Sequence, residues 1–304
     1  MTRTDASLYP DYAEAEFACA RALALDASEV ALLNGLDEGI HAVSFAHLQR
    51  AEDGRQREAV IVLPAFDMYA ACAEIAAARI VEVPPQADLA FPADAVVRAI
   101  TPDTRVVFLC SPNNPTGLAI PRADLLRVLA ALPPGAVALL DEAYVDFARG
   151  SCLDLLAAHP NLVIGRTFAK AHGLAAVRAG CLAAQAGTLA RIRPFLPPYS
   201  VNVFARTAMV AALADTDYLE WYRAEVAASK HLLYALCDRL GLHYWPSEAN
   251  FVLVRVGDRA PALVREMAAR GVAIRDRSTQ PGCAGCSRFT TGVVAHTRRG
   301  LALM

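Results

Sequence analysis

Three short apolar runs in the middle of the chain are each followed by polar residues of types that do chemistry. The runs are VVFLC (106–110), AVALL (136–140) and NLVIG (161–165). The polar residues that follow them are Asn114, then Asp141 and Tyr144, then Thr167, Lys170 and Arg178. The three sets recur at intervals of about thirty residues, which is a usual size for a strand–helix–strand step. Because ligands of open α/β sheets bind at the carboxyl ends of the strands, we expect these side chains to converge on one crevice.

These residue types fit an aldehyde cofactor that carries a pyridine ring and a phosphate. Lys170 offers an amine that can bind the aldehyde covalently, and desolvation beside positive charge would lower the pKa of that amine and make it a nucleophile. Asp141 can keep the pyridine nitrogen protonated, while Asn114 and Tyr144 can donate hydrogen bonds to the ring oxygen. The segment NGLDEGI (34–40) predicts a tight turn that opens a helix, and a helix N-terminus suits a phosphate.

Each of these residues also has an ordinary structural interpretation. A single lysine such as Lys170 is usually a solvated surface charge, Asp141 can cap a helix, and Asn114 can belong to a turn. Arg178 offers a cation for the same phosphate. What favours the functional interpretation is the shared position of these residues at the ends of successive predicted strands.

The order of apolar and helical segments predicts the fold. Continuous apolar runs that alternate with helical patterns are typical of parallel strands covered on both faces, and the runs at 59–66 and 178–184 extend the same sheet. After about Asn202 the pattern changes to long helices, one strand at 250–256 and a further helix at 260–271. We therefore predict an α/β fold with a mostly parallel central sheet flanked by helices and a smaller C-terminal α+β domain. The predicted domains are 1–205 and 206–304.

Composition excludes several classes of function. The 304 residues contain 29 Lys and Arg against 31 Asp and Glu, and a formal charge of −2 argues against nucleic acid or an acidic membrane as a partner. The longest apolar stretch (59–83) is interrupted by Asp67, Glu74 and Arg79, whereas a membrane helix needs about 20 apolar residues in a row. The first residues lack the pattern of a secretory signal. We expect a cytoplasmic protein.

The cysteines do not predict a metal site. Eight are scattered singly, apart from Cys283 and Cys286 in GCAGC. A zinc site needs further ligands, and the chain has neither a second C-x-x-C nor a closely spaced pair of histidines. The remaining cysteines stand among apolar neighbours, as in VVFLCSP, and we expect them to be buried thiols and not disulfides.

The segments SPNNPTG (111–117), DEAYVDFA (141–148) and TFAKAHGLAAVRAG (167–180) resemble the signature segments of fold-type I, class I/II aminotransferases. Members of that group use pyridoxal 5′-phosphate (PLP). The nearest likeness is to the histidinol-phosphate aminotransferase family. It extends along the chain through SLYPD (7–11), NGLDEGI (34–40), LPAFDMY (63–69), SEANFVLVRV (247–256) and RDRSTQPGCAGCSRFTTG (275–292).

This resemblance implies a role for each residue around the cofactor ring. Lys170 binds the cofactor covalently and later moves a proton between the substrate and the cofactor. Asp141 pairs with the pyridine nitrogen, and Asn114 and Tyr144 contact the ring oxygen. Phe66 occupies the position of an aromatic side chain that stacks on the ring.

The resemblance also implies where the phosphate and the substrates bind. Backbone N–H groups of Leu36 and Asp37 hold the phosphate, together with the side chains of Thr167, Arg178 and, from the neighbouring subunit of a homodimer, Tyr9. The substrates, an amino donor and a 2-oxo acid, contact Arg275 and Arg288, because a guanidinium fits either a carboxylate or a phosphate monoester. The implied reaction is a ping-pong exchange of an amino group between L-histidinol phosphate and 2-oxoglutarate.

Several features depart from the family pattern. Ala169 stands where a serine usually contacts the phosphate, His172 replaces a usual phenylalanine, and Leu36 replaces a usual small residue. The chain also begins almost at the SLYPD segment. We therefore expect the family's N-terminal contribution to the smaller domain to be absent.

The residues leave other functions open. The same fold and cofactor also serve aromatic amino acid aminotransferases and decarboxylases of a phosphorylated amino acid. Arg275 favours a phosphorylated substrate, because an aromatic side chain gives this arginine no partner. A non-catalytic relative of the fold is a further alternative, motivated by Ala169 and by the expected lack of the N-terminal segment. A nicotinamide-dependent dehydrogenase is disfavoured, because no G-x-G-x-x-G follows a predicted strand.

Overall fold

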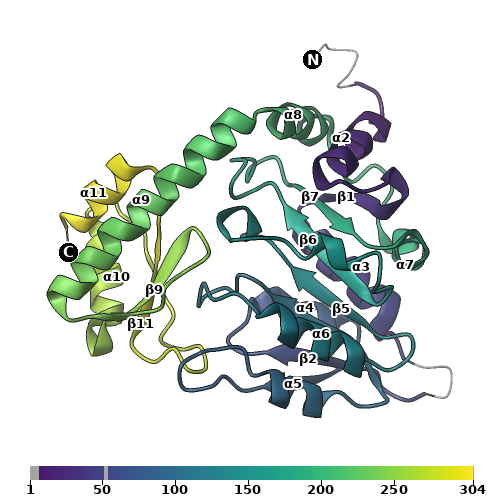
Figure 1. The fold of residues 1–304 in the computed structure, drawn as a ribbon, viewed down its shortest axis with the longest axis horizontal. Helices are drawn as coiled ribbons and strands as arrows, with labels where there is room; N and C mark the ends of the chain where they lie inside the picture. Colours follow the sequence, from purple (N-terminus) through teal and green to yellow (C-terminus); the bar gives the residue numbers. More distant parts are fainter. Residues whose placement is uncertain (1–6, 51–53, 304) are drawn as a thin grey trace.

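The computed structural model of the protein describes residues 7–50 and 54–303. They form two β-sheets with helices packed around them (Figure 1). The larger sheet has seven strands in the order β1-β7-β6-β5-β4-β2-β3. Their bounds are β1 (Val30–Asn34), β2 (Glu58–Val62), β3 (Arg79–Val83), β4 (Thr104–Cys110), β5 (Val137–Asp141), β6 (Leu162–Thr167) and β7 (Ala179–Ala183).

Helices cover both faces of this sheet, as expected for strands that are buried on both sides. Their bounds are α2 (Ala13–Leu23), α3 (Leu36–Leu48), α4 (Asp67–Ile75), α5 (Ala93–Ala99), α6 (Arg122–Ala131), α7 (Ala186–Ile192) and α8 (Val203–Ala214). Helices α3, α4 and α7 pack on one face, and α5 and α6 pack on the other. Helices α2 and α8 cover the end of the sheet formed by β1 and β7.

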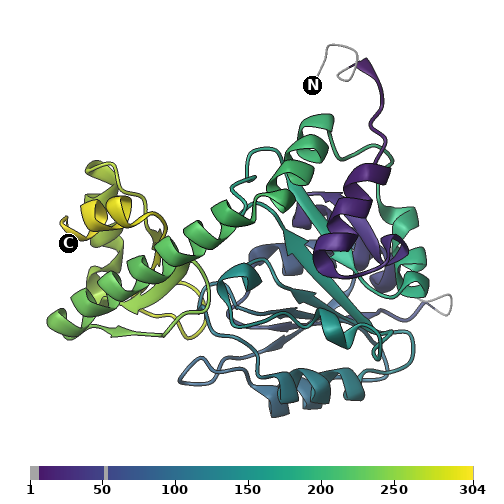
Figure 2. The ribbon, with the colours of Figure 1, turned by 45° about the horizontal axis from the view of Figure 1, so that its top comes forward.

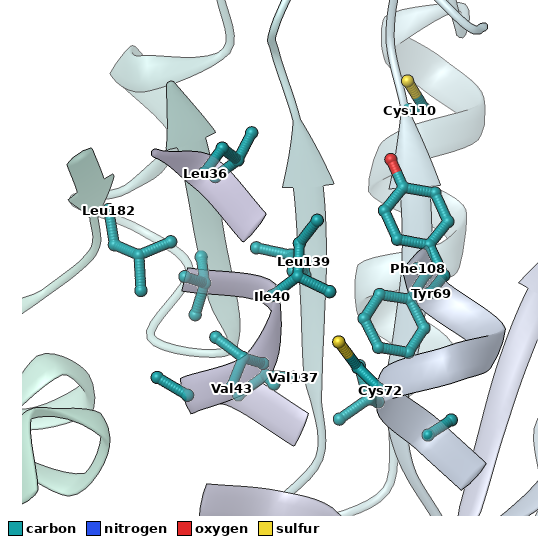
Figure 3. Close-up of a cluster of buried hydrophobic side chains, with 14 of the residues drawn as sticks. Leu36, Ile40, Val43, Tyr69, Cys72, Phe108, Cys110, Val137, Leu139 and Leu182 are labelled. Atoms are coloured by element: carbon teal, nitrogen blue, oxygen red, sulfur yellow. The ribbon is translucent and has the colours of Figure 1, made fainter. Parts of the chain in front are cut away.

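Most neighbouring strands of the large sheet run in parallel. β2 pairs in parallel with β3 and β4, and β5 pairs in parallel with β4 and β6, whereas β7 is antiparallel to both of its neighbours. Alternate residues of a strand face opposite sides, so Phe108 and Leu109 of β4 pack in different clusters. Figure 3 shows the cluster of Phe108, where Ile40 of α3 and Tyr69 of α4 pack against the sheet.

A smaller antiparallel sheet, in the order β10-β11-β9-β8, lies beside the large one. Its strands are β8 (His243–Tyr244), β9 (Phe251–Arg255), β10 (Arg275–Asp276) and β11 (Cys286–Thr290). The helices around it are α9 (Thr216–Leu240), α10 (Ala260–Ala269) and α11 (Val294–Leu301). Helix α9 connects the two groups of elements, as Figures 1 and 2 both show. Its N-cap residue Asp215 accepts a hydrogen bond from the Tyr218 N–H at 3.1 Å.

The predicted fold class is confirmed, because a mostly parallel sheet flanked by helices is accompanied by a small antiparallel sheet near the C-terminus. The three apolar runs that end in polar residues form β4, β5 and β6, and the run at 59–66 forms β2. The run at 178–184 forms β7 and joins the sheet in the reverse direction. The predicted boundary between residues 205 and 206 lies within α8, and the division into two domains stays a prediction.

Two further features concern the chain as a whole. Among the described residues, none of the helices combines the length and apolar character that a membrane crossing requires. The eight cysteines are free thiols, and seven of them are buried. Burial raises the pKa of Cys72 to about 11, which keeps such a thiol in its unreactive protonated form at neutral pH.

Candidate active site

Two adjoining cavities lie where the parallel strands β4, β5 and β6 end. The inner cavity measures about 170 Å³ and the outer one about 370 Å³. The residues that line both are Phe66, Asn114, Tyr144 and Lys170. The inner cavity is also lined by Leu36, Asp37, Asp141, Thr167 and Arg178. The outer cavity is also lined by Arg275, Arg277, Gln280 and Arg288.

Lys170 lies in the loop that follows β6, with its Nζ 5.6 Å from the centre of the Tyr144 ring. Burial and, after it, the nearby Arg288 guanidinium lower the pKa of the Lys170 amine. A lower pKa increases the fraction of neutral amine, which is the nucleophilic form. The chain contains one other lysine, Lys230, whose Nζ donates a hydrogen bond to the Ser247 carbonyl oxygen at 2.7 Å. Lys170 is therefore the lysine whose amine faces the cavities.

The buried carboxylate of Asp141, the last residue of β5, is held by two hydrogen bonds. The Tyr69 hydroxyl donates to Oδ2 at 2.6 Å, and the Ala143 N–H donates to Oδ1 at 2.8 Å. Tyr69 is fixed on α4, stacks on Phe108 with ring centres 5.1 Å apart, and directs its hydroxyl toward the Cys110 end of β4 (Figure 3). Burial raises the pKa of Asp141, while the two donors oppose that shift because they stabilise the charged form. Asp141 is thus an oriented carboxylate beneath the inner cavity.

The N-terminus of α3 forms another wall of the inner cavity. Gly35 precedes the helix with a φ of +81°, and a Cβ at this position would lie 2.5 Å from Nη2 of Arg178. N–H groups in the first turn of a helix have no partner within the helix and attract anions. Arg178 Nη2 donates a hydrogen bond to Asp37 Oδ2 at 3.0 Å, which keeps its guanidinium at this turn. Arg178 itself has a φ of +61°, a strain of about 1 kcal/mol of the kind found at binding sites.

Arginines line the outer cavity from the small sheet. Arg275 in β10 is the direct cross-strand partner of Arg288 in β11. Arg288 donates a hydrogen bond to Asn114 Oδ1, and its guanidinium lies over the Phe251 ring at 4.9 Å from the ring centre. Arg277, two residues after Arg275, lines the same cavity. The outer cavity therefore combines cations from the small sheet with side chains carried by the large one.

Most residues that the sequence analysis singled out line one or both cavities. They are Phe66, Asn114, Tyr144, Lys170, Leu36, Asp37, Asp141, Thr167, Arg178, Arg275 and Arg288. Tyr9 lies outside the cavities of its own chain, is largely exposed, and stacks on Tyr199 with ring centres 4.6 Å apart. Two further residues of the site, Tyr69 and Arg277, were not predicted from the sequence. Tyr69 carries no signal in the sequence for its contact with Asp141, whereas Arg277 has one, because alternate residues of a strand share a face.

The chain is similar to a known protein family and to proteins of known sequence and structure. Residues 3–302 match the model of the family described as aminotransferase class I and II. The chain is 43% identical over 205 residues to histidinol-phosphate aminotransferase 2 of Ralstonia nicotianae, and this alignment covers 66% of the chain and 54% of that relative. It is 34% identical over 286 residues to the histidinol-phosphate aminotransferase of Anoxybacillus flavithermus, with 92% of the chain and 74% of that relative covered.

A solved structure adds the cofactor to this comparison. The histidinol-phosphate aminotransferase of Sinorhizobium meliloti in complex with pyridoxal-5′-phosphate has a TM-score of 0.86 and 26% sequence identity to this chain. The similarity covers 99% of this chain and 83% of that one.

The chemistry of the inner cavity fits PLP. Lys170 offers an amine for the aldehyde, Asp141 a buried carboxylate for the pyridine nitrogen, and the N-terminus of α3 an anion site for the phosphate. In the part of the chain that the structure describes, no group of three or more side chains is arranged to hold a metal ion. The family match along nearly the whole sequence, the fold and this chemical fit agree, and the chain belongs to the class I and II aminotransferases, which are PLP-dependent enzymes.

Proposed function

We propose that this aminotransferase exchanges an amino group between L-histidinol phosphate and 2-oxoglutarate by a ping-pong mechanism, as a step of histidine biosynthesis. The observation that carries the proposal is the outer cavity, which is lined by arginines and shares Lys170 with the inner one. Both proposed substrates carry anionic groups, a phosphate monoester in one and two carboxylates in the other, and arginine binds both kinds of group well. The names of the two relatives support the same choice.

Lys170 and Asp141 do the central chemistry in this proposal. PLP, when bound, withdraws electrons from the carbon that bears the substrate's amino group. The neutral amine of Lys170 accepts the proton of that carbon at its Nζ and later donates this proton again. The pKa of the Lys170 amine, lowered by burial and by Arg288, favours this neutral form. The Asp141 carboxylate holds a proton on the pyridine nitrogen, and the Tyr69 hydroxyl keeps that carboxylate in place.

The remaining residues of the inner cavity hold and orient the cofactor. Asn114 and Tyr144 donate hydrogen bonds to the ring oxygen, and Phe66 packs on the face of the ring. The phosphate receives hydrogen bonds from the first turn of α3 and from side chains beside it. These phosphate ligands are the N–H groups of Leu36 and Asp37 and the side chains of Thr167 and Arg178.

One set of arginines serves both half-reactions in this proposal. Arg275 and Arg288 lie opposite each other on β10 and β11 and line the outer cavity. A guanidinium offers a planar fork of donors that fits a carboxylate or a phosphate equally. The same pocket can therefore receive the phosphorylated donor first and the dicarboxylate acceptor second.

A homodimer and a cytoplasmic location belong to the same proposal. Tyr9 is exposed and lies outside the cavities of its own chain, and we propose that it reaches the PLP phosphate of the neighbouring subunit. Phe17 on α2 and Phe204 on α8 are also large apolar side chains exposed on elements that pack together. Exposed apolar groups of this kind suit a subunit interface.

The test of this function is the visible absorption spectrum of the purified, PLP-loaded protein. We expect a yellow band that bleaches when L-histidinol phosphate is added and returns when 2-oxoglutarate is added. If the band does not change with histidinol phosphate but bleaches with phenylalanine, the amino donor is an aromatic amino acid. Carbon dioxide release from a phosphorylated amino acid would identify a decarboxylase, and a protein that never takes up PLP would be a non-catalytic relative.

A further inference from the structure

Three arginines, and not two, share one face of the small sheet. Arg275 lies in β10, and side chains on alternate residues of a strand point to the same side. The Arg277 N–H continues the ladder by donating to the Cys286 carbonyl oxygen at 2.9 Å. Arg277 therefore follows Arg275 on the face where Arg288 is the cross-strand partner, and all three line the outer cavity.

These three guanidinium groups lack anionic partners among the described residues. None of them forms an ion pair with a carboxylate in residues 7–50 or 54–303. Nε of Arg277 and Nε of Arg288 are buried without a hydrogen-bond partner, and so is Oε1 of Gln280 beside them. Two acidic residues, Asp67 and Asp276, also line the cavity. Asp276 already accepts a hydrogen bond from the Ser278 N–H at 2.8 Å.

Such an arrangement is unfavourable unless an anion joins it. Like charges directly opposite one another on two strands repel, and a buried polar atom without a partner destabilises the fold. A doubly charged ligand removes both costs, because its oxygens accept hydrogen bonds from several guanidinium groups at once.

The three arginines do not occupy equivalent places. Arg288 donates a hydrogen bond to Asn114, which lines both cavities together with Lys170. Arg275 and Arg277 have no hydrogen bond to the side chains around Lys170, and they line the outer cavity but not the inner one. Of the three arginines, Arg288 therefore lies nearest to the reacting carbon, and Arg275 and Arg277 line the part of the pocket that receives an anionic group attached to that carbon.

We propose that Arg277 is a third substrate-binding residue and that, with Arg275, it forms a subsite for a dianionic group that the substrate carries next to its amino-bearing carbon. Arg288 lies nearer to the reacting carbon. This inference rests on the proposed function because it concerns the same pocket, and it adds Arg277 to the residues that select a phosphorylated amino donor over an aromatic amino acid.

The first test measures binding without turnover. Inorganic phosphate is titrated into the PLP-loaded protein by calorimetry, where the cofactor's own phosphate already occupies the first turn of α3. We expect Arg277→Gln to weaken phosphate binding about tenfold or more, because it loses one charge-assisted contact. Arg277→Lys restores part of the affinity. Arg265→Gln, which removes an exposed charge on α10, serves as the matched control and binds phosphate as the wild type does.

The second test separates a binding role from a structural one. With L-histidinol phosphate as donor, Arg277→Gln should raise KM about tenfold and leave kcat within about a factor of two, since the lost contact is to the phosphate and not to the atoms that react. With phenylalanine as donor, KM should not change.

Three outcomes decide the matter. Equal losses for both donors, or wild-type phosphate binding in Arg277→Gln, would overturn the inference and leave the proposed function in place. The third outcome combines two results: the wild-type protein does not transaminate histidinol phosphate, yet Arg277→Gln weakens phosphate binding. This outcome would overturn the proposed function and keep the dianion subsite.

Discussion

Lys170 and Lys230 are the two lysines of this chain, so the covalent attachment of PLP can be tested at single-residue precision. We expect Lys170→Ala to abolish the visible band of lysine-bound PLP and the transamination activity, because the other lysine, Lys230, does not line the cavities. Lys230→Arg is the matched control, since Lys230 bonds to the Ser247 carbonyl oxygen outside the site, and it should keep both properties. Borohydride reduction followed by peptide mapping should place the pyridoxyl group on Lys170, and a label on Lys230 would refute the assignment.

The lowered pKa of the Lys170 amine predicts how PLP capture depends on pH. The neutral amine attacks the aldehyde, so the capture rate of the apoprotein should rise with pH and level off above the Lys170 pKa, at a lower pH than an ordinary lysine would require. After burial, Arg288 is the next cause of that low pKa. Arg288→Gln should therefore raise the pKa and move the rise to higher pH, followed as the growth of visible absorbance. Identical midpoints in the two proteins would show that Arg288 does not act on the amine.

The hydrogen bond from Tyr69 to Asp141 predicts a cost in stability. Tyr69→Phe leaves Oδ2 of a buried carboxylate without its donor, and we expect the free energy of unfolding of the apoprotein to fall by about 1–2 kcal/mol. Urea denaturation measures this change. Tyr199→Phe, at a half-exposed ring, should change the stability by much less. Loss of the donor also raises the pKa of Asp141 further, because the hydrogen bond stabilises the charged form.

At the scale of elements, the packing of β7 beneath α3 controls the phosphate site. A Cβ at Gly180 would lie 2.9 Å from the Arg166 carbonyl oxygen and 3.1 Å from the Leu36 nitrogen, both of them backbone atoms. Gly180→Ala must therefore shift the backbone at Arg166 in β6, and it also crowds the first turn of α3 at Leu36. We expect a loss of about 1–3 kcal/mol in stability and a PLP affinity that is lower by about tenfold, measured by urea denaturation and by PLP titration of the apoprotein.

Gly187 in α7 provides the comparison for that change. A Cβ there meets nothing within 4 Å, and alanine has a higher helix propensity than glycine. Gly187→Ala should keep the PLP affinity and the stability, or raise the stability by up to about 1 kcal/mol. An unchanged PLP affinity in Gly180→Ala would mean that the first turn of α3 tolerates the shift.

Sequence patterns predicted the elements that carry the polar strand ends, and the reason is physical. β4, β5 and β6 are buried on both faces, so their apolar runs are continuous. Asp141 and Thr167 are the last residues of β5 and β6, and Asn114 lies in the loop after β4. The reversed direction of β7 was not predicted, although residues 168–178 contain no crossover helix that could return the chain for a parallel strand. The bond between Tyr69 and Asp141 was beyond sequence reasoning, because it joins residues 72 positions apart whose approach depends on how α4 packs.

At the scale of the whole molecule, the proposed homodimer predicts that two defective chains can complete each other. Tyr9→Phe should weaken PLP binding about tenfold through loss of one bond to the phosphate, while Lys170→Ala has no lysine-bound PLP. In a mixed dimer, the Tyr9→Phe chain would keep Lys170 and receive an intact Tyr9 from its partner. We expect such dimers, prepared by co-refolding differently tagged chains, to show one tight, yellow site. Weak binding at that site would place Tyr9 in the pocket of its own chain.

Helix α9 gives this molecule a mechanical property. Its 25 residues make a rod about 37 Å long. Near its start, Tyr222 contacts Phe147, in the segment that follows Tyr144. Further along, Ser229 donates a hydrogen bond to the Gly292 carbonyl oxygen, just after β11, at 2.7 Å. The first turns of α9 therefore pack beside the large sheet, and its later turns pack against the small sheet. A tilt of about 10° moves the far end of such a rod by about 6 Å, so a single angle can set how far the arginines stand from the lysine.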